Sequence, residues 1–516
     1  MRDIRMAFLV AVAASALTGA ILRAGVGFDD ANITMNYAEN IAHGHGYVYF
    51  VGGERVEGST SALWTAINTL AFSLFGRAEV FLALLGFCLG AGTVLVTMRI
   101  ARHIADLAGH DGGAAAAAAC LTFLAFPTFW GWAVWSYMDV TLWVFLNALA
   151  FLLLLKLPAS SGSRSTAGFI AVLVLVAFCR PEGVAAGLGF SGLAVLLVWG
   201  DDAWRALRTG AVSGLAVLVA VGALTALRLS YFGVPVPNTF YAKVSTSYLD
   251  QLAYGFYYVW TFLFHPLNAV LVLGFLAALP VGLRTGGGFL RAFLAALALV
   301  LAGAAMYAVL GGDHFGGHRF LQMFLPLMIP FAILPVLSAL GWVDARLSGR
   351  LPVHAVAAGL AILAAWSAYI RNGGYLWREL LIAREGREVG QRLNAYPGTP
   401  SVGIVAAGGI SMTYDGPIYD LMGLNWTKMA MAGRDHTGRP KNHGGFDRDV
   451  FFEELPALIA PALGGCDKEA VQSRRTLEIV LQDLLRDPRF TSLYEFECLN
   501  DVGFFRLKDL PSPQDG

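Results

Sequence analysis

The sequence has few charged residues for its length, and this scarcity narrows the class of protein. Only 14% of its 516 residues are Asp, Glu, Lys or Arg, whereas about 25% is usual for a soluble domain. The formal net charge is +0 and no basic stripe occurs, so no nucleic-acid partner is predicted. The apolar residues, 57% of the chain, form repeated runs of roughly 16 to 25 residues, long enough to cross a bilayer. The composition therefore predicts a polytopic membrane protein.

Cysteine is also scarce, with five residues in the chain. Cys88, Cys120 and Cys179 lie in or beside apolar runs without CxxC spacing, which gives no indication of a metal or redox site. Cys466 and Cys498 share the polar C-terminal segment. They form a disulfide if that segment faces an oxidising compartment, and two free thiols are the alternative.

About eleven transmembrane helices are predicted. The N-terminal apolar run resembles a signal peptide, but its length and the spans that follow indicate an uncleaved first helix. Segment 61–76 contains several Ser, Thr and Asn residues and is predicted to lie at the interface instead of crossing. The predicted spans are 6–24, 80–98, 114–134, 140–156, 166–179, 183–199, 210–229, 257–282, 292–310, 320–340 and 353–370.

The basic residues set the orientation of these helices. With 61–76 not crossing, every inner loop contains a basic pair, such as Arg99 with Arg102 and Arg205 with Arg208. The sequence then divides into a transmembrane domain over 1–370 and an extracytoplasmic domain over 371–516. The second is predicted to be a small α/β domain, because 401–406 is typical of a buried strand and 477–485 of an amphipathic helix.

The outer loops contain most of the polar residues that can do chemistry. Ionisable groups at a membrane boundary are costly without a purpose or partner, so their collection on one side predicts a site. The candidate residues are Asp29, Asp30, Asp139, Arg180, Glu182, Asn238, Tyr241, Lys243, Asp313, His318 and Arg319.

Each of these patterns has two interpretations. Asp29 and Asp30 are a general base or ligands of a divalent cation, or simply a solvated helix end. Arg180 is a phosphate ligand or half of a structural ion pair with Glu182. One interpretation is that a phosphate is held jointly by Lys243, His318 and Arg319. The other is that each of them is a separate charge at the membrane interface. The His43-Gly44-His45-Gly46 stretch has two histidines that suggest a metal site, but its glycines favour a turn, and we predict no metal there.

Several stretches resemble the GT-C glycosyltransferases, most closely the terminal arabinofuranosyltransferases of the actinobacterial cell wall. The resemblance begins with Asp29-Asp30-Ala31 and runs to Trp64. Later stretches follow in the same order, and they are Met138-Asp139, Arg180-Pro181-Glu182-Gly183, Pro237 to Lys243, Gly311 to Phe320 and Asp415 to Asn425. The chain departs from the family pattern at Asn32, Asn36, Glu39, Ala62 and Asp139.

The resemblance implies a GT-C-like membrane domain whose catalytic carboxylate is Asp30 or Asp29. It implies that a polyprenyl-phosphate donor supplies a pentose, with arabinofuranose the leading candidate, to an extracytoplasmic glycan acceptor. The donor-phosphate ligands are expected to be Arg180, Lys243, His318 and Arg319. The substrate-binding residues are expected to be Glu57, Asp139, Glu182, Asn238, Tyr241 and Asp313. No cofactor is required, although a divalent cation stays open.

Three alternatives remain at the level of sequence. A GT-C enzyme with another sugar, or with a protein acceptor such as pilin, would look similar. A transporter or flippase of a lipid-linked sugar predicts ionisable residues near the middle of the spans and broken helices. A scaffold that binds cell-wall glycan predicts that the loop aspartates can be replaced. The expected location is the cell (inner) membrane.

Overall fold

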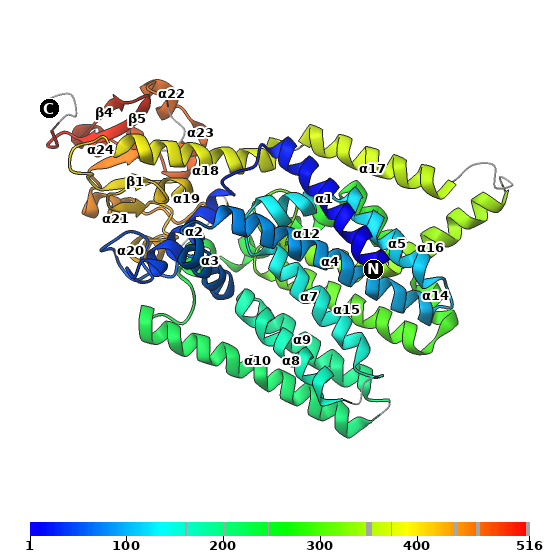
Figure 1. The fold of residues 1–516 in the computed structure, drawn as a ribbon. Coiled ribbons are helices and arrows are strands. Elements are labelled where there is room, and N and C mark those ends of the chain that lie inside the picture. Colours follow the sequence, from blue (N-terminus) through cyan, green and yellow to red (C-terminus); the bar gives the residue numbers. More distant parts are fainter. Residues whose placement is uncertain are drawn as a thin grey trace. The chain divides into compact units, whose positions relative to one another are not determined.

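The computed structural model describes residues 1–159, 162–200, 202–245, 247–346, 353–372, 374–434, 436, 439, 441–460 and 465–511. The chain forms two compact units. Unit 1 consists of residues 1–24, 83–224 and 255–376, and unit 2 consists of residues 25–82, 225–254 and 377–516. Figure 1 labels many of the helices and strands of both.

All eleven predicted spans fall on helices. The helices concerned are α1 (Arg2–Leu22), α4 (Glu79–Leu107), α5 (Gly112–Thr122), α6 (Pro127–Trp130), α7 (Val140–Lys156), α8 (Ser163–Cys179), α9 (Gly183–Val198), α10 (Ala203–Phe232), α12 (Tyr248–Phe264), α13 (Pro266–Leu276), α14 (Leu279–Thr285), α15 (Gly287–Val309), α16 (Leu325–Arg346) and α17 (Val353–Asn372). Within the described residues, six helical segments are long and apolar enough to cross a membrane, or seven if one bent pair is a single span. The chain is therefore a multi-pass membrane protein.

Two predicted spans are broken, and each break lies beside a proline. The predicted span 114–134 bends by 76° between the segments Gly112–Ala125 and Pro127–Trp135. The predicted span 257–282 divides between α12 and α13 at Pro266. Proline disfavours helical geometry in the residue before it, and His265 is extended, with φ −63° and ψ 129°. The apolar runs did not show these breaks, because proline interrupts the helix without lowering the hydropathy much.

Segment 61–76 forms the short helix α3 (Ala62–Phe75), which Ser61 caps by accepting from the Trp64 backbone N–H at 3.1 Å. At about 1.5 Å rise per residue, 14 residues are too short to cross a hydrocarbon core. The helix buries Thr65 and Asn68 and exposes Leu70, Leu74 and Phe75. The helix also buries Trp64, Ala71 and Phe72, and its exposed apolar side chains suit a place at a lipid interface.

Unit 2 contains one five-stranded sheet in the order β2-β1-β3-β5-β4. The strands are β1 (Val402–Ile404), β2 (Ile418–Asp420), β3 (Leu458–Ala460), β4 (Tyr494–Leu499) and β5 (Val502–Leu507). Strand β1 is parallel to both β2 and β3, whereas β5 is antiparallel to both β3 and β4. The predicted strand at 401–406 is therefore confirmed as β1, and so is a small α/β domain after the membrane helices.

The other helices of this domain include α18 (Gly374–Leu393), α19 (Ala407–Ser411), α20 (Thr427–Ala432) and α21 (Arg448–Glu454). Figure 1 shows β1, β4 and β5 grouped with α18, α19 and α21 in yellow to red. The predicted helix 477–485 is α23 (Arg475–Val480) followed by a turn, because Gln482 and Asp483 adopt positive φ. Cys466 and Cys498 form a disulfide, with 5.4 Å between their Cα atoms.

The core of unit 2 joins parts of the chain that are far apart in sequence. Tyr37 and Tyr49 of the first loop pack in one cluster with Ile404, Ile410 and Phe504 of the C-terminal segment. Helix α2 (Asp29–Ala42) and helix α11 (Asn238–Lys243) belong to this unit as well. The predicted domain boundary at residue 371 stays a prediction. The hydrophobic core of unit 2 includes residues of the first loop together with residues of the C-terminal sheet.

Candidate active site

Asp29 and Asp30 occupy the first turn of α2 in unit 2. The N-terminus of a helix carries a partial positive charge, which favours acids at this place. Both side chains are half-buried, so they lie at the edge of the unit's interior.

Asp29 anchors α2 to the C-terminal domain. Its carboxylate oxygens accept from the backbone N–H groups of Gly408 and Gly409 at 3.0 and 2.8 Å. A Cβ at position 408 would lie 1.8 Å from the backbone oxygen of Asp29, so only glycine fits there. Burial raises the pKa of Asp29 to about 6, and the two N–H bonds only partly offset this rise.

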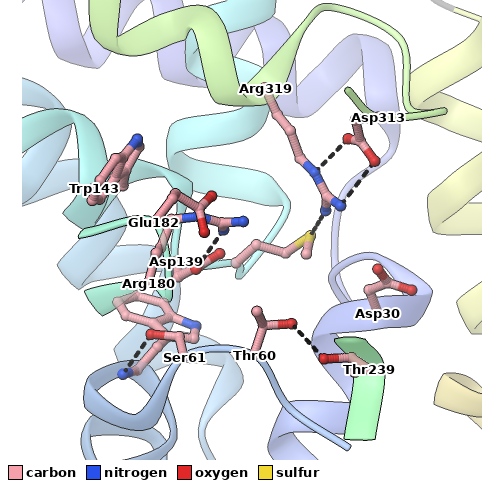
Figure 2. Close-up of polar contacts among 12 residues, drawn as sticks. Asp30, Thr60, Ser61, Asp139, Trp143, Arg180, Glu182, Thr239, Asp313 and Arg319 are labelled. Carbon is pink, nitrogen blue, oxygen red and sulfur yellow. Dashed lines mark hydrogen bonds and ion pairs between the residues drawn. The ribbon is translucent and has the colours of Figure 1, made fainter. Parts of the chain in front are cut away.

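Asp30 lies beside a cation. Its Oδ2 lies 3.4 Å from the Nζ of Lys243, the last residue of α11, and each side chain is 21% exposed. Figure 2 labels Asp30 on α2. The two groups are farther apart than those of the buried ion pairs in this protein, and both side chains keep some contact with solvent.

Glu57 and Arg228 form a buried ion pair. The two carboxylate oxygens accept from the Nε and Nη2 of Arg228 at 2.6 and 2.8 Å, and both residues are less than one-tenth exposed. Sequence reasoning selected Glu57 but missed Arg228. The available signal was a single cation near the end of the predicted span 210–229, since such a charge needs a partner.

The predicted residues of α11 also contact the C-terminal domain. Asn238 donates from Nδ2 to the backbone oxygens of Gly423 and Leu424 at 2.8 and 3.0 Å. The Arg434 guanidinium lies 5.4 Å from the centre of the Tyr241 ring. These contacts hold α11, and with it Lys243, against the segment that follows β2.

A buried carboxylate network lies beside α2. Asp420 is fully buried and accepts from the backbone N–H of Met422 and from the backbone and side chain of Asn425. Tyr37 of α2 donates its hydroxyl to Asn425 Oδ1 at 3.1 Å. Burial raises the pKa of Asp420 to about 6 against these hydrogen bonds. Sequence reasoning noted the 415–425 stretch only as a family likeness, because nothing local shows that Tyr37 meets it.

Unit 1 contains a second cluster of predicted residues. Arg180 contacts Asp139 and Glu182, each at 2.7 Å, and all three side chains are less than one-tenth exposed. Tyr307 donates to Glu182 at 3.2 Å. Figure 2 shows Arg180 with Asp139 and Glu182. The geometry is that of the structural ion pair, extended to a second carboxylate.

Arg319 belongs to the same unit. Its Nε lies 2.6 Å from Asp313 Oδ2, and its Nη1 lies 3.3 Å from the sulfur of Met138 (Figure 2). Phe320 packs against both guanidiniums, with ring centre distances of 4.3 Å to Arg180 and 4.6 Å to Arg319. This aromatic ring therefore connects the two arginines.

His318 adopts a left-handed backbone with φ 51°, and its Nε2 lies 3.0 Å from the Thr261 hydroxyl. The ring centres of His43 and His45 are 6.3 Å apart. No group of three or more His, Cys, Asp or Glu residues suited to a metal occurs in the part of the chain that the structure describes. Among the predicted residues, unit 2 brings together Asp29, Asp30, Glu57, Asn238, Tyr241 and Lys243, and unit 1 brings together Asp139, Arg180, Glu182, Asp313, His318 and Arg319.

No protein-family model and no curated protein matches this chain. Solved structures do resemble it. ArnT from Cupriavidus metallidurans bound to undecaprenyl phosphate aligns with a TM-score of 0.55 and 15% identity over 98% of each chain. The apo state of that protein gives 0.52 and 15% over 88% of this chain and 92% of that one.

The archaeal oligosaccharyltransferase AglB from Archaeoglobus fulgidus, in complex with an inhibitory peptide and a dolichol-phosphate, is also similar. It aligns with a TM-score of 0.51 and 13% identity over 98% of this chain and 75% of its own. At these identities the likeness establishes the fold alone. The chain therefore has the fold of the GT-C glycosyltransferases, a polytopic helical domain followed by a small α/β domain.

Proposed function

We propose that this protein is a membrane glycosyltransferase that moves a sugar from a polyprenyl-phosphate carrier to an acceptor hydroxyl. The observation that carries the proposal is the Asp30–Lys243 pair, an accessible carboxylate beside a cation in a chain with this fold. A carboxylate and a cation are the two groups that such a transfer needs, one for the proton and one for the departing phosphate.

In the proposed reaction, Asp30 is the general base. The acceptor hydroxyl oxygen attacks the anomeric carbon while its proton passes to the Asp30 carboxylate. The bond between the anomeric carbon and the phosphate oxygen breaks, and the electron pair leaves with the polyprenyl phosphate. Lys243 would balance the charge that develops on this leaving group.

The other predicted residues take supporting places in the proposal. Asp29 holds the first turn of α2 through Gly408 and Gly409, so it positions Asp30 and is not the base itself. Arg180 and Arg319 are buried and lie 2.6–2.7 Å from their carboxylates, whereas Lys243 lies 3.4 Å from Asp30 and is 21% exposed, so we assign the phosphate to Lys243.

The donor sugar proposed is a pentose, arabinofuranose, and the acceptor a glycan outside the membrane. The support is the family resemblance of the loop sequences. We place the protein in the cell membrane with the C-terminal domain extracytoplasmic. The Cys466–Cys498 disulfide supports this orientation, because disulfides persist in oxidising compartments.

The test is transfer by purified protein. Given lipid-linked arabinose and an arabinan acceptor, the protein should extend the acceptor, and Asp30→Asn should lower the rate by roughly 100- to 10,000-fold. Normal transfer by Asp30→Asn would remove the assignment of the base. Reporter fusions that place 29–30 and 313–319 on opposite sides of the membrane would refute the proposed topology.

A flippase is the second candidate, and the broken helices favour it. The break at Pro127 is surrounded by buried Phe123, Phe129 and Trp130, however, and no Asp, Glu, Lys, Arg or His occurs between 112 and 135. Transporters place polar groups at such breaks, so we rank this candidate lower. Flipping of a lipid-linked sugar in sealed vesicles without an acceptor would reverse the ranking.

A further inference from the structure

A glycine-rich loop of unit 1, Gly311 to His318, leads into the 3₁₀ helix η3 (Arg319–Phe324). Its last residue, His318, has φ 51° and ψ 53°, a left-handed backbone that is costly for a residue with a Cβ. The Trp132 indole N–H donates to the Gly316 oxygen at 3.2 Å, which helps to hold the loop in place. Costly backbone conformations gather at functional sites, so the side chain of His318 is a candidate for a role in binding.

Thr261 of α12 determines which nitrogen of the His318 ring carries the hydrogen. The hydroxyl oxygen of Thr261 lies 3.0 Å from His318 Nε2. It also lies 2.9 and 3.1 Å from the backbone oxygens of Tyr257 and Tyr258. A hydroxyl has one hydrogen, and if this pointed to the imidazole, oxygen atoms would face each other with no hydrogen between them. The hydroxyl therefore donates to the helix backbone, and the imidazole donates to the hydroxyl from Nε2.

The other ring nitrogen of His318, Nδ1, is then an acceptor. Burial and the nearby His265 lower the pKa of His318 to about 4, although Asp313 acts in the opposite direction, so the ring is neutral at neutral pH. A neutral imidazole with its hydrogen on Nε2 has a lone pair on Nδ1. Among the described residues this Nδ1 has no hydrogen-bond partner, and the side chain keeps partial exposure.

Gln322 supplies a second acceptor four residues later. Its Nε2 donates to the backbone oxygen of Gly317 at 2.6 Å, so its Oε1 faces away from that carbonyl, since a flipped amide would set oxygen against oxygen. The residue is 6% exposed, and within the part of the chain that the structure describes its Oε1 has no hydrogen-bond partner. Buried polar atoms are normally paired, so a ligand that donates a hydrogen bond would complete this group.

Two acceptors with fixed orientation select the chemistry of the ligand. The first belongs to the residue after Gly317, and the second belongs to the side chain that binds the Gly317 carbonyl, so both lie beside the same turn. An ionised phosphate oxygen accepts hydrogen bonds and cannot donate them, so neither lone pair would attract it. A sugar hydroxyl donates, and neighbouring hydroxyls on one sugar can serve two acceptors.

We propose that His318 Nδ1 and Gln322 Oε1 accept hydrogen bonds from hydroxyl groups of a sugar. The inference rests on the proposed function, because the sugar is a substrate of that transfer. It assigns His318 to the sugar and not to the phosphate for which the sequence favoured this residue. The donor sugar and the acceptor glycan present the same hydroxyl chemistry.

The test uses the full-length protein in nanodiscs and measures binding of lipid-linked arabinose, arabinan and polyprenyl phosphate without a sugar. His318→Phe keeps the aromatic ring, and Gln322→Met keeps the length of the side chain, but both remove the acceptor. Each should weaken binding of one sugar ligand roughly five- to hundred-fold and leave binding of polyprenyl phosphate unchanged. His318→Asn should retain most of the binding, because asparagine tolerates the left-handed backbone and supplies an amide oxygen near the place of Nδ1.

Gln472→Met is the matched control, since the Gln472 amide likewise donates to a backbone oxygen, that of Leu485 at 2.9 Å. It should bind every ligand as the wild type does. Weaker binding of lipid-linked arabinose by the two site variants would assign the acceptors to the donor sugar, and weaker binding of arabinan would assign them to the acceptor glycan.

Unchanged binding of both sugar ligands by monodisperse His318→Phe and Gln322→Met would overturn the inference and leave the proposed transfer intact. Weaker binding of polyprenyl phosphate itself by His318→Phe would also overturn it, since His318 would then contact the phosphate. Sugar binding that depends on His318, in a wild-type protein that transfers no sugar, would support the inference and refute the proposed function alone.

Discussion

Substitutions in the ion pair between Glu57 and Arg228 can show whether Glu57 stabilises the fold or binds substrate. Replacing Glu57 by Gln keeps the shape of the side chain but removes its charge. Arg228, whose side chain is 8% exposed, then loses a bidentate partner at 2.6 and 2.8 Å. Removing one partner of a buried ion pair costs about 3–5 kcal/mol, because the other charge stays buried without compensation.

We therefore expect Glu57→Gln and Arg228→Gln each to lower the temperature at which the purified protein loses its monodisperse peak in size-exclusion chromatography. The double variant should lose much less than the sum of the two, because the residues that remain are both neutral. The pair Glu57→Leu with Arg228→Met should come close to wild-type stability.

One result would refute this reasoning. If Glu57→Gln keeps its thermal stability and loses transfer activity, Glu57 contacts substrate and the ion pair is not what holds it. Additive losses in the double variant would equally show that the two residues do not interact. The cycle thus decides between the sequence-derived role of Glu57 and the role that its geometry indicates.

Three further predictions concern unit 2. Burial raises the pKa of Asp420 to about 6, so this residue stabilises the folded state below pH 4, and that stabilisation is lost as the pH rises to 6. The change in the free energy of unfolding is about 3 kcal/mol. A pH series of thermal stability should show this change in the wild type and not in Asp420→Asn. Breaking the disulfide with Cys498→Ser should cost about 4 kcal/mol for a loop of 32 residues, and in a Cys88→Ala background, which removes the exposed free thiol, maleimide should label the protein only after reduction. Gly408→Ala should displace the backbone at Asp29 and abolish transfer. Gly465→Ala is the control and should stay active, because a Cβ at that position meets open space. An active Gly408→Ala enzyme would contradict the anchoring of α2.

The sequence alone determined the membrane class, the helical character of the apolar runs and the presence of a small α/β domain. These features depend on composition and on local apolar periodicity, which the chain carries along its length. The strand at 402–404 was predictable for the same reason. The two breaks in the spans were missed, since hydropathy averages over a window and a proline acts on one residue.

The site was only partly predictable. Asp29 and Asp30 could be selected as a pair, but nothing in their neighbourhood shows that one binds Gly408 and Gly409 while the other faces Lys243. That distinction is made by segments about 200 and 380 residues away. Hydrogen bonds and ion pairs act over a few ångströms in space and leave no trace in sequence spacing, so only the tertiary structure decided which carboxylate binds the backbone of α19 and which lies beside Lys243.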